Sequence, residues 1–257
     1  MKARGVDNRL LAALPSKERQ RILANCESIE LVSTDILHQA GTRLRHVYFP
    51  TGGFISMVTP LDTCAGLEVA LIGREGMVGI PLLLGVSASS LNHVVQGAGG
   101  ALRMDVAAFQ RELKRSPALR GRLGRYAYVS LYQLAQTAAC TRFHTVEERL
   151  ARWLLMAHDR SRSDEVHATH EFLAYMLGVR RAGITKAASS LQQQSQIRYF
   201  RGDITILDRD GLEGSACGCY AAATDFYQQV LSKQRQSMWM RAAHTTACGC
   251  RLSINVR

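Results

Sequence analysis

The chain has 257 residues, of which 47% are hydrophobic and 21% are charged, as expected for a protein that buries a substantial core. This composition excludes a disordered chain, a collagen and a coiled-coil rod. The 32 Lys and Arg residues exceed the 21 Asp and Glu residues and give a formal net charge of +11, which indicates either a polyanionic partner such as nucleic acid or a merely solubilising basic surface.

No apolar run approaches the roughly 18–20 residues that a membrane-spanning helix needs. The longest, Met77–Val86, is interrupted by Gly79, Pro81 and Gly85, and the apolar part of the N-terminus is too short for a signal peptide. We therefore expect a cytoplasmic protein without a membrane partner. Its seven cysteines are expected as thiols or metal ligands, not as disulfides.

The first half of the chain predicts short helices followed by a β-rich region. Residues 8–24 carry their leucines and isoleucines on one side around Pro15, which indicates helical pieces. From residue 29 to about residue 104, short β-rich runs alternate with glycine turns, as in an antiparallel β sandwich or barrel. These runs are Arg45–Phe49, Phe54–Thr59, Leu67–Ile72 and Asn92–Gln96, with a turn at Pro50–Gly53.

Two helices are predicted next. Ser116 and Pro117 are an N-cap and a first helical residue, and the helix that they open continues to about residue 139. A second helix opens with the capping box Thr145-Val146-Glu147-Glu148, runs to about His158 and precedes a polar loop over residues 159–169. The longer helix carries an apolar stripe that suits either its own core or a dimer interface: Leu119, Leu123, Ala127, Ser130, Leu134 and Ala138.

The stretch EFLAYMLGVRRAGITKAASSL, Glu171–Leu191, has the pattern of a helix-turn-helix. Ala174 suits the point where the two helices cross, and Gly178 suits the tight turn. The inward-facing apolar positions are Leu173, Leu177, Val179, Ile184 and Ala187. The second helix is expected to begin near Arg180, and its outward face carries Arg180, Arg181, Thr185, Lys186 and Ser189. The alternative is an αα-hairpin with a solvated basic face.

The side chains of this second helix suit DNA contacts of different kinds. Arg181 lies in the first turn, where a recognition helix contacts base edges, and arginine is the usual bidentate partner of guanine. Arg180 and Lys186 suit phosphates, which position a protein without specifying sequence. Gly183 costs around 1 kcal/mol of helix stability against alanine, and a close approach to the DNA backbone is one reason for a glycine there.

A short hairpin follows the second helix. Ile197–Phe200 and Ile204–Leu207 are the predicted strands, and Arg201-Gly202-Asp203 is the turn between them. A hairpin at this position is the wing of a winged helix, and Arg198 and Arg201 are its candidate contacts to the DNA backbone. Helix-turn-helix and wing together make a much more specific pattern than either alone.

From about residue 10 to residue 215 the chain resembles the Crp/Fnr superfamily of bacterial transcription regulators. The resemblance rests on DILHQAGTRLRHVYFPTGGFIS (Asp35–Ser56), VEERLARWLL (Val146–Leu155) and FLAYMLGVRRAGIT (Phe172–Thr185). It implies an α+β fold with an N-terminal antiparallel β-roll sensor domain of the cyclic-nucleotide-binding type, a long dimerisation helix and a C-terminal winged helix-turn-helix. The expected boundaries are residues 1–116, 117–141 and 142–215, followed by a tail of unclear order over 216–257.

The resemblance also implies a function, that of a homodimer which binds double-stranded DNA, contacts RNA polymerase and responds to a small-molecule effector. It aligns Arg181 with the guanine-reading arginine of the family and Lys186 with a second basic DNA contact. Ala182 stands where the best-known members have a base-reading glutamate, so the DNA sequence recognised is expected to differ from theirs.

The sensor domain departs from the members that bind cyclic AMP. Those members hold the ribose with a Gly-Glu-Leu segment and the phosphate with an Arg-Ser/Thr-Ala segment. The matching residues 79–81 and 89–91 read Gly-Ile-Pro and Ser-Ser-Leu, and a buried phosphate without a cation is costly, so we expect no binding of cyclic AMP. Arg74 and Glu75 lie too early to replace these contacts without a register shift. The candidate contacts to an unidentified effector are Arg74, Glu75, Gly76 and Gly79.

Two C-x-C pairs, Cys217-Gly218-Cys219 and Cys248-Gly249-Cys250, leave an alternative open in which a metal or a thiol-redox signal is the input. Four thiolates can form a tetrahedral zinc site, although C-x-x-C is the commoner spacing, and free thiols are the other interpretation. We expect no cofactor.

An enzyme is not indicated, because the chain contains no G-x-S-x-G, P-loop or H-E-x-x-H motif. A competing interpretation remains, in which the chain is a small-ligand module or an enzyme and the basic helices are only its surface. That interpretation predicts weak DNA binding that is blind to sequence.

Overall fold

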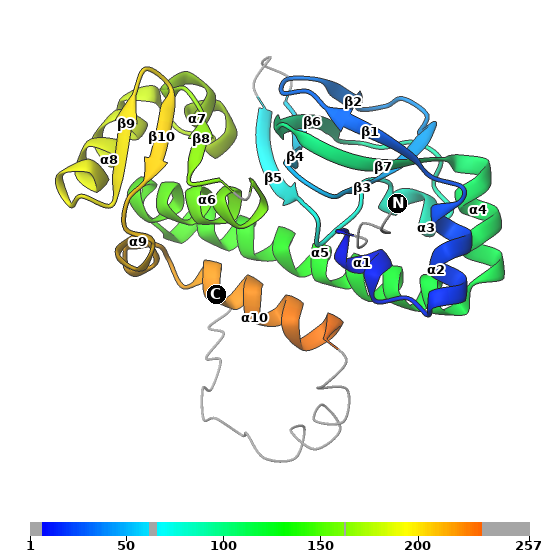
Figure 1. The fold of residues 1–257 in the computed structure, drawn as a ribbon. Helices are drawn as coiled ribbons and strands as arrows, with labels where there is room; N and C mark the ends of the chain where they lie inside the picture. Colours follow the sequence, from blue (N-terminus) through cyan, green and yellow to red (C-terminus); the bar gives the residue numbers. More distant parts are fainter. Residues whose placement is uncertain (1–6, 62–65, 162, 233–257) are drawn as a thin grey trace, which may run out of the picture.

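The chain folds into two units that are joined by one long helix, α5 (Pro117–Phe143), which runs along both of them (Figure 1). This computed structural model describes residues 7–61, 66–161 and 163–232. The N-terminal unit is built from two sheets and short helices, and the C-terminal unit is helical with a small sheet. Among the helices of the described residues, none is long and apolar enough to cross a membrane.

The N-terminal unit is a β-roll made of two antiparallel sheets. One sheet has the strand order β1-β7-β3 and the other has the order β2-β6-β4-β5. Buried side chains such as Tyr48, Ile55 and Val95 fill the space between them. The four predicted runs correspond to β3 to β6. The other three strands were not predicted, because β1 is mostly polar and exposed, β2 is very short and β7 begins with two glycines. The strands are β1 (Glu27–Leu31), β2 (Ile36–His38), β3 (His46–Pro50), β4 (Phe54–Pro60), β5 (Gly66–Ile72), β6 (Asn92–Gly97) and β7 (Gly99–Asp105).

The predicted turn between β3 and β4 depends on Gly53. Its backbone has φ 67°, in the left-handed region that a side chain disfavours. A Cβ atom at this position would also collide with the carbonyl groups of Gly97 and Ala98, which cross behind the turn. The predicted turn is therefore present. Glycine stands at position 53 because the turn between β3 and β4 passes close to the turn between β6 and β7.

Short helices α1 (Arg9–Ala12), α2 (Ser16–Leu23), α3 (Ile80–Leu83) and α4 (Val106–Arg115) flank the β-roll, and α1, α3 and α4 pack against α5. The start of α5 confirms its predicted N-cap, because Ser116 Oγ accepts a hydrogen bond from Leu119 N at 3.0 Å. The helix ends at Phe143, about one turn later than predicted.

The apolar stripe predicted on α5 lies in two different environments. Leu119 and Leu123 are buried in the core with Phe49 and Phe109. Further along, Ala127, Ser130 and Leu134 are only half-buried, and Ala138 is exposed. The stripe is therefore neither one core face nor one free face. A different row is exposed along the helix, and we call it the α5 row: Gly121, Gly124, Tyr128, Leu131, Ala135 and Ala138.

The C-terminal unit begins with α6 (Val146–Ser161), whose predicted capping box is confirmed. Thr145 N donates to Glu148 Oε2 at 2.7 Å, and Glu148 N donates to Thr145 Oγ1 at 3.3 Å. The prediction of a polar loop over residues 159–169 is partly wrong. This segment contains strand β8 (Glu165–His167), which pairs with β10. So short a strand has no periodicity of its own, and only the pairing defines it.

The remaining elements of this unit are α7 (His170–Leu177), α8 (Arg181–Gln193), β9 (Ile197–Phe200), β10 (Asp203–Ile206), α9 (Arg209–Ser215) and α10 (Cys219–Leu231). The strands form a sheet of order β8-β10-β9. The core of the unit gathers around α6 and includes Leu150, Leu154 and Ile184.

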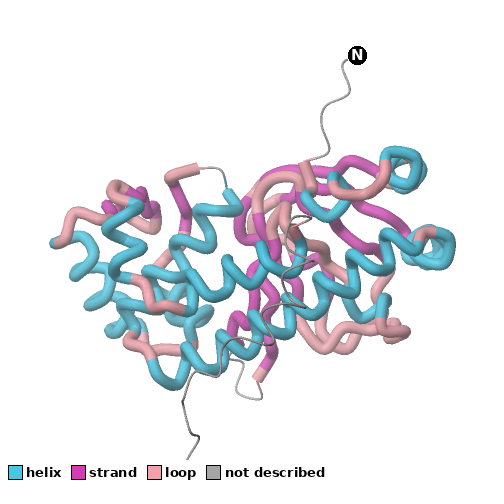
Figure 2. Tube along the Cα trace, turned by 90° about the horizontal axis from the view of Figure 1, so that it is seen from below, coloured by secondary structure: helices cyan, strands magenta, loops and turns pink. Residues whose placement is uncertain are grey.

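Helix α10 overturns part of the expectation for the tail over residues 216–257. It lies beside α5 in both views (Figures 1 and 2), and the ring of Phe226 stacks on that of Tyr132 at 4.0 Å between centroids. Tyr227 and Leu231 enter the core that α5 shares with the β-roll. The segment is ordered because its apolar side chains recur at helical spacing and find a partner surface on α5. Residues 233–257 of the predicted tail lie outside the described residues.

Candidate nucleic-acid interface

The helix-turn-helix consists of α7, a tight turn and α8. Thr169 caps α7, because its Oγ1 accepts a hydrogen bond from Phe172 N at 3.1 Å. Gly178 ends α7 with φ 63°, and its N–H donates to Tyr175 O at 3.2 Å. Val179 N donates to Ala174 O at 3.0 Å and leads the chain into α8. The turn predicted at Gly178 is thereby confirmed.

The inward face of the two helices is the one that the sequence predicts. Ala174 is 8% exposed, as expected for a small residue where two helices meet. The other predicted positions belong to the core around α6: Leu173, Leu177, Ile184 and Ala187 are buried and Val179 is partly buried against them. This packing fixes which side of α8 faces outward.

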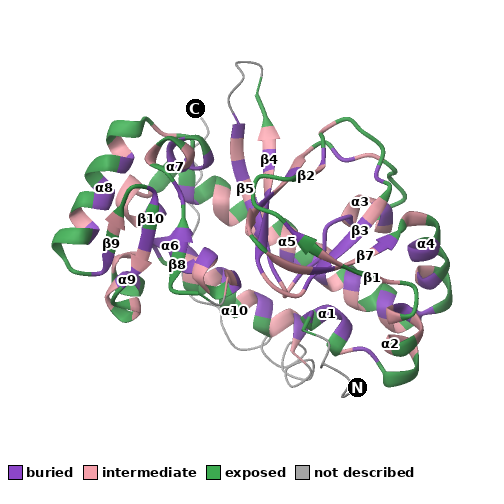
Figure 3. Ribbon diagram, turned by 45° about the horizontal axis from the view of Figure 1, so that its top comes forward, coloured by how far each residue is buried: buried purple, intermediate pink, exposed green. Residues whose placement is uncertain are grey.

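The outward face of α8 is exposed, as the green segments of this helix in Figure 3 show, and it carries basic side chains. Arg180 is the N-cap residue and makes no side-chain capping bond, and Arg181 is the first residue of the helix. The predicted DNA contacts are all exposed: Arg180, Arg181, Thr185, Lys186, Ser189, Arg198 and Arg201. Within the described part of the chain, no ion pair joins any of these arginines or the lysine to a carboxylate.

Thr185 is held in place by two neighbours. Its Oγ1 lies 3.2 Å from Arg181 O and 3.1 Å from His170 Nδ1. Burial and the nearby charge of Arg181 lower the pKa of His170, so its imidazole is neutral at physiological pH. His170 was not predicted as a site residue, because the sequence indicates only an N-cap at the preceding threonine.

Gly183 does not face the DNA side of α8. It is half-buried, and a Cβ atom there would meet Val146 of α6 at 3.7–3.8 Å, which is an ordinary contact distance. This placement does not favour a close backbone approach to DNA at this residue, which stays a prediction. The glycine lies at the contact between α8 and α6.

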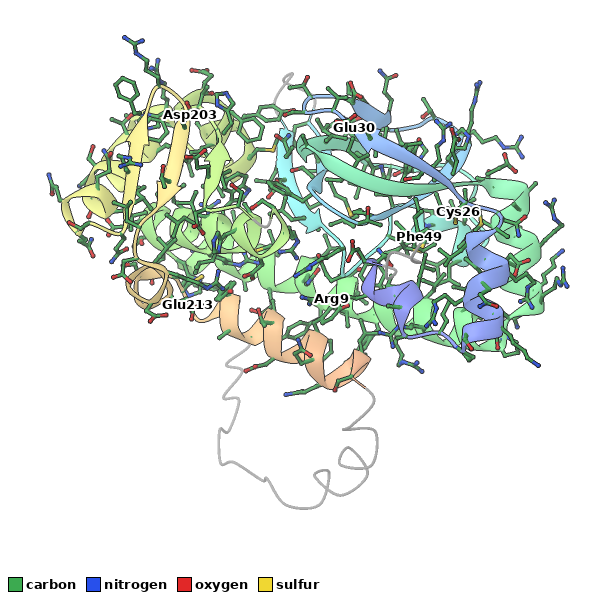
Figure 4. All side chains as sticks on the ribbon, in the orientation of Figure 1. Arg9, Cys26, Glu30, Phe49, Asp203 and Glu213 are labelled. Carbon is green, nitrogen blue, oxygen red and sulfur yellow. The ribbon has the colours of Figure 1, made fainter. Side chains whose placement is uncertain are left out.

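The wing lies directly beside α8. Arg201 and Gly202 form its turn with φ 51° and 96°. Asp203, which is labelled in Figure 4, follows the turn as the first residue of β10. The Arg201 guanidinium stacks over Phe200 at 5.2 Å, and this phenylalanine is 66% exposed. An exposed aromatic side chain beside an arginine is suited to lie along a sugar-phosphate backbone, a feature that the sequence analysis missed.

Two contacts of Tyr199 bind the wing to the helices of the helix-turn-helix. Tyr199 N donates to Gln192 Oε1 at 2.7 Å, and the ring of Tyr199 stacks on His170 with centroids 4.4 Å apart. Gln192 of α8, His170 of α7 and Tyr199 of β9 therefore join the three elements. This arrangement orients Arg198 and Arg201 relative to Arg181 without a bound partner.

The candidate effector residues are not brought together. Arg74 and Glu75 line a cavity of about 330 Å³ between the β-roll, α6 and α10, whereas Gly76 and Gly79 are not among its lining residues. Glu75 Oε1 accepts hydrogen bonds from Arg160 Nε at 2.8 Å and from Gly73 N at 3.0 Å. Arg74 and Glu75 therefore lie where the two units meet, and Gly79 precedes α3 on the β-roll.

A second buried contact joins the two units at Glu68 of β5. Trp153 Nε1 of α6 donates to Glu68 Oε1 at 2.8 Å, and Ser56 Oγ of β4 donates to Glu68 Oε2 at 2.5 Å. Burial raises the pKa of Glu68 to about 7, although these hydrogen bonds oppose the shift. The carboxyl group therefore titrates near neutral pH at the contact between the β-roll and the C-terminal unit.

Of the two C-x-C pairs, only Cys217 and Cys219 lie among the described residues. Cys217 and Cys219 are buried between α9 and α10, next to Cys140 of α5. Cys248 and Cys250 lie outside the described residues. The predicted pairing of the two C-x-C motifs thus stays a prediction, while Cys140 is a neighbour that the sequence analysis did not consider.

Comparison with known proteins agrees with this architecture. Residues 148–214 match the family model of the Crp-like helix-turn-helix domain. No curated protein matches the chain. The α+β fold predicted from the sequence is confirmed by its similarity to solved structures, whose sequence identities to this chain are low and which therefore bear on the fold alone. Similar solved structures include a transcriptional regulator assigned to the Crp/Fnr family from Eubacterium rectale (17% identity, TM-score 0.63, covering 80% of this chain and 96% of that one), the c-di-GMP responsive global regulator CLP from Xanthomonas campestris (15%, 0.61, 75% and 99%) and the CRP-family regulator TTHB099 from Thermus thermophilus (17%, 0.62, 73% and 96%).

Proposed function

We propose that this DNA-binding transcription regulator, which carries a Crp-like helix-turn-helix domain in the fold of the Crp/Fnr superfamily, binds a two-fold symmetric DNA site as a homodimer. The observation that carries the proposal is the exposed cationic face of α8, which is free of ion pairs to carboxylates among the described residues and continues into the wing. Its function is binding and not catalysis.

The side chains of this face have separate roles in the proposal. Arg181, at the first turn of α8, contacts the O6 and N7 atoms of a guanine in the major groove. Arg180 and Lys186 contact phosphates on either side, while Thr185 and Ser189 supply hydroxyl donors. From the wing, Arg198 and Arg201 contact the adjacent DNA backbone.

Dimer formation is assigned to the α5 row. Its spacing alternates between three and four residues, as in the seam of a coiled coil, and its glycines and alanines permit a close approach of two helices. Tyr128 and Leu131 are 55% and 62% exposed in the single chain, and burial between two copies would remove this apolar surface from water. The two recognition helices then lie about 34 Å apart in successive major grooves.

The β-roll is proposed as the sensor. A ligand other than cyclic AMP is supported by residues 79–81 and 89–91, which carry no charged side chain to hold a ribose or a phosphate. The cavity at Arg74 and Glu75 offers a place where an unidentified effector would contact both units at once. A ligand with different affinities for two arrangements would shift the spacing of the recognition helices. We place the protein in the cytoplasm, with RNA polymerase as its protein partner.

The test is the selection of DNA by the full chain from a random palindromic pool, at fixed salt concentration, with non-specific competitor and without added ligand. The expected result is an enriched two-fold symmetric site, bound by two chains as counted by analytical ultracentrifugation. Binding that depends on salt but not on sequence, with and without cyclic nucleotides, zinc and reductant, would contradict the proposal.

A further inference from the structure

We infer that Cys140, His144, Cys217 and Cys219 form a tetrahedral site for one zinc ion, which fastens the end of α5 to the segment between α9 and α10. This site goes beyond the proposed DNA-binding function and does not depend on it. It also differs from the four-thiolate site that the two C-x-C pairs predict, because two of its ligands come from the long helix.

The four residues come from two places in the chain. Cys140 lies in the last turn of α5, and His144 follows one turn later as the C-cap residue of this helix. Cys217 and Cys219 flank Gly218, directly after α9 and at the first turn of α10. The fold brings these segments together because α10 packs along α5.

The distances suit a tetrahedral ion. Cys140 Sγ and Cys217 Sγ are 3.4 Å apart, Cys219 Sγ and His144 Nδ1 are 3.6 Å apart, and all four ligand atoms lie within 4.8 Å of one another. Zinc with Zn–S bonds of about 2.3 Å and a Zn–N bond of about 2.0–2.1 Å requires ligand separations of roughly 3.6–3.8 Å. Only small side-chain shifts are needed to reach this geometry.

The burial of the ligands indicates a closed structural site. Cys140, Cys217 and Cys219 are 1%, 4% and 7% exposed and make a cluster of their own, separate from the larger cores. His144 is half-buried and closes the site from the side of the helix end. Four protein ligands leave no open coordination position for a substrate, and soft thiolates favour zinc over magnesium or calcium.

Two buried arginines of α6 supply the electrostatic argument. Arg149 and Arg152 are 8% and 7% exposed and line a small cavity of about 30 Å³ together with Cys140. In the described part of the chain neither arginine forms an ion pair with a carboxylate, although the charge of Arg152 also acts on Glu68. Arg149 donates to Leu177 O and Arg152 to Thr137 Oγ1, while Arg152 Nε has no hydrogen-bond partner. Buried charges are costly unless they are compensated. A zinc ion with three thiolates carries a net negative charge and would compensate these guanidinium groups.

Zinc content per chain, measured by inductively coupled plasma mass spectrometry on the full chain purified without chelator, is the first test. We expect one zinc per chain in the wild type and a loss of zinc in His144→Ala. The variant His144→Cys restores four ligands and should retain the ion. Because His144 is only half-buried, circular dichroism should show that both variants fold.

The matched control is Cys26→Ser, which should retain zinc. Figure 4 shows Cys26 beside the β-roll, far from Glu213 on the helix that precedes the proposed site. The double variant Cys248→Ser/Cys250→Ser should also retain zinc, and loss of the ion in that variant would overturn the proposed ligand set.

Cobalt provides a second measurement that does not need a variant. Titration of Co²⁺ into the chelator-treated, reduced full chain should produce thiolate-to-cobalt charge-transfer absorption and the intense visible bands of a tetrahedral ion. Absence of zinc in the purified chain together with absence of these bands overturns the inference. A Cys140–Cys217 disulfide in the purified chain, which blocks alkylation of these two cysteines until a reductant is added, would overturn it in favour of a redox pair.

Discussion

Arg181 and Lys186 lie on the same exposed face of α8, but the proposal assigns them different kinds of contact. The guanidinium of Arg181 has the fork geometry that matches two acceptors on guanine, whereas the ammonium of Lys186 is a point charge suited to a phosphate. Only the first contact depends on base sequence. The two side chains therefore make a matched pair for testing how the protein recognises DNA.

For Arg181→Ala we expect a loss of about 1–3 kcal/mol in binding free energy for each half-site and relaxed specificity at one base pair of each half-site. Lys186→Ala should weaken binding equally for all sequences and reduce the slope of log K against log salt by about 1 per chain, which is about 2 for the dimer. Fluorescence anisotropy with the selected site, with its single-base variants and at several salt concentrations measures both effects. Unchanged selectivity in Arg181→Ala would mean that another residue of α8 contacts the bases.

Gly183 is a residue whose role the structure changed. Because a Cβ atom there makes only an ordinary contact with Val146, Gly183→Ala should stabilise the protein by about 1 kcal/mol through helix propensity. The matched control is Gly178→Ala, which should destabilise because the backbone is left-handed and a Cβ atom would press on Leu67. Urea denaturation measures both changes. A drop in DNA affinity in Gly183→Ala would restore the idea of a close DNA approach at this residue.

At the scale of secondary-structure elements, α5 has two faces: one packs into the core, and the other carries the proposed dimer interface. Leu119, Leu123 and Val129 anchor it in the core of the β-roll, and the α5 row remains on the outside. A helix that contacts both units and also exposes an alternating apolar row is suited to transmit a change in the proposed sensor to the second copy of the proposed dimer. Its contribution to dimerisation can be separated from its contribution to folding, because the two faces share no side chain.

Leu131→Glu should convert the dimer to a monomer, because it places two like charges at the centre of the α5 row. The matched control is Leu84→Glu, the same substitution at a leucine that is 69% exposed and lies outside α5. Analytical ultracentrifugation at several protein concentrations measures the change. If both variants remain dimers, the interface lies on another face. Loss of the dimer in Leu84→Glu but not in Leu131→Glu would also place the interface on another face.

At the scale of the whole molecule, the contact at Glu68 makes stability depend on pH. Its pKa is about 7 in the folded chain and 4.5 as the ordinary value, so the folded state favours the protonated form. This contribution to stability is fully present below pH 4.5 and is lost as the pH rises towards 7, to a total of roughly 3 kcal/mol. The stability that is lost belongs to the contact of Glu68 in β5 with Ser56 in β4 and Trp153 in α6, which joins the two units.

Glu68→Gln removes the titrating group while keeping a side chain that can bond to Ser56 and Trp153. We expect the difference in unfolding free energy between variant and wild type to increase in favour of the variant as the pH rises from 4.5 to 8. Urea denaturation at a series of pH values measures this difference. A difference that does not change with pH would show that Glu68 does not titrate in this range.

Local features of the chain were predictable from sequence because they depend on neighbours along it. Ser116, the Thr145–Glu148 capping box and Gly178 each satisfy or break the backbone hydrogen bonds of their own helix, so a few residues suffice to predict them. The outward face of α8 follows from the helical period in the same way. The DNA-binding unit, with the residues proposed to contact DNA, is therefore largely determined by the sequence itself.

Contacts between segments far apart in the chain were decided only by the tertiary structure. The three-residue strand β8 exists because β10 pairs with it, and α10 lies where α5 offers an apolar surface. Cys140 and His144 stand more than seventy residues before Cys217, so no spacing rule could join them into a metal site. The face of α5 that is free for a partner likewise depends on which of its side chains the β-roll and α10 already cover. Periodicity predicts that a helix has faces, but only packing decides what each face meets.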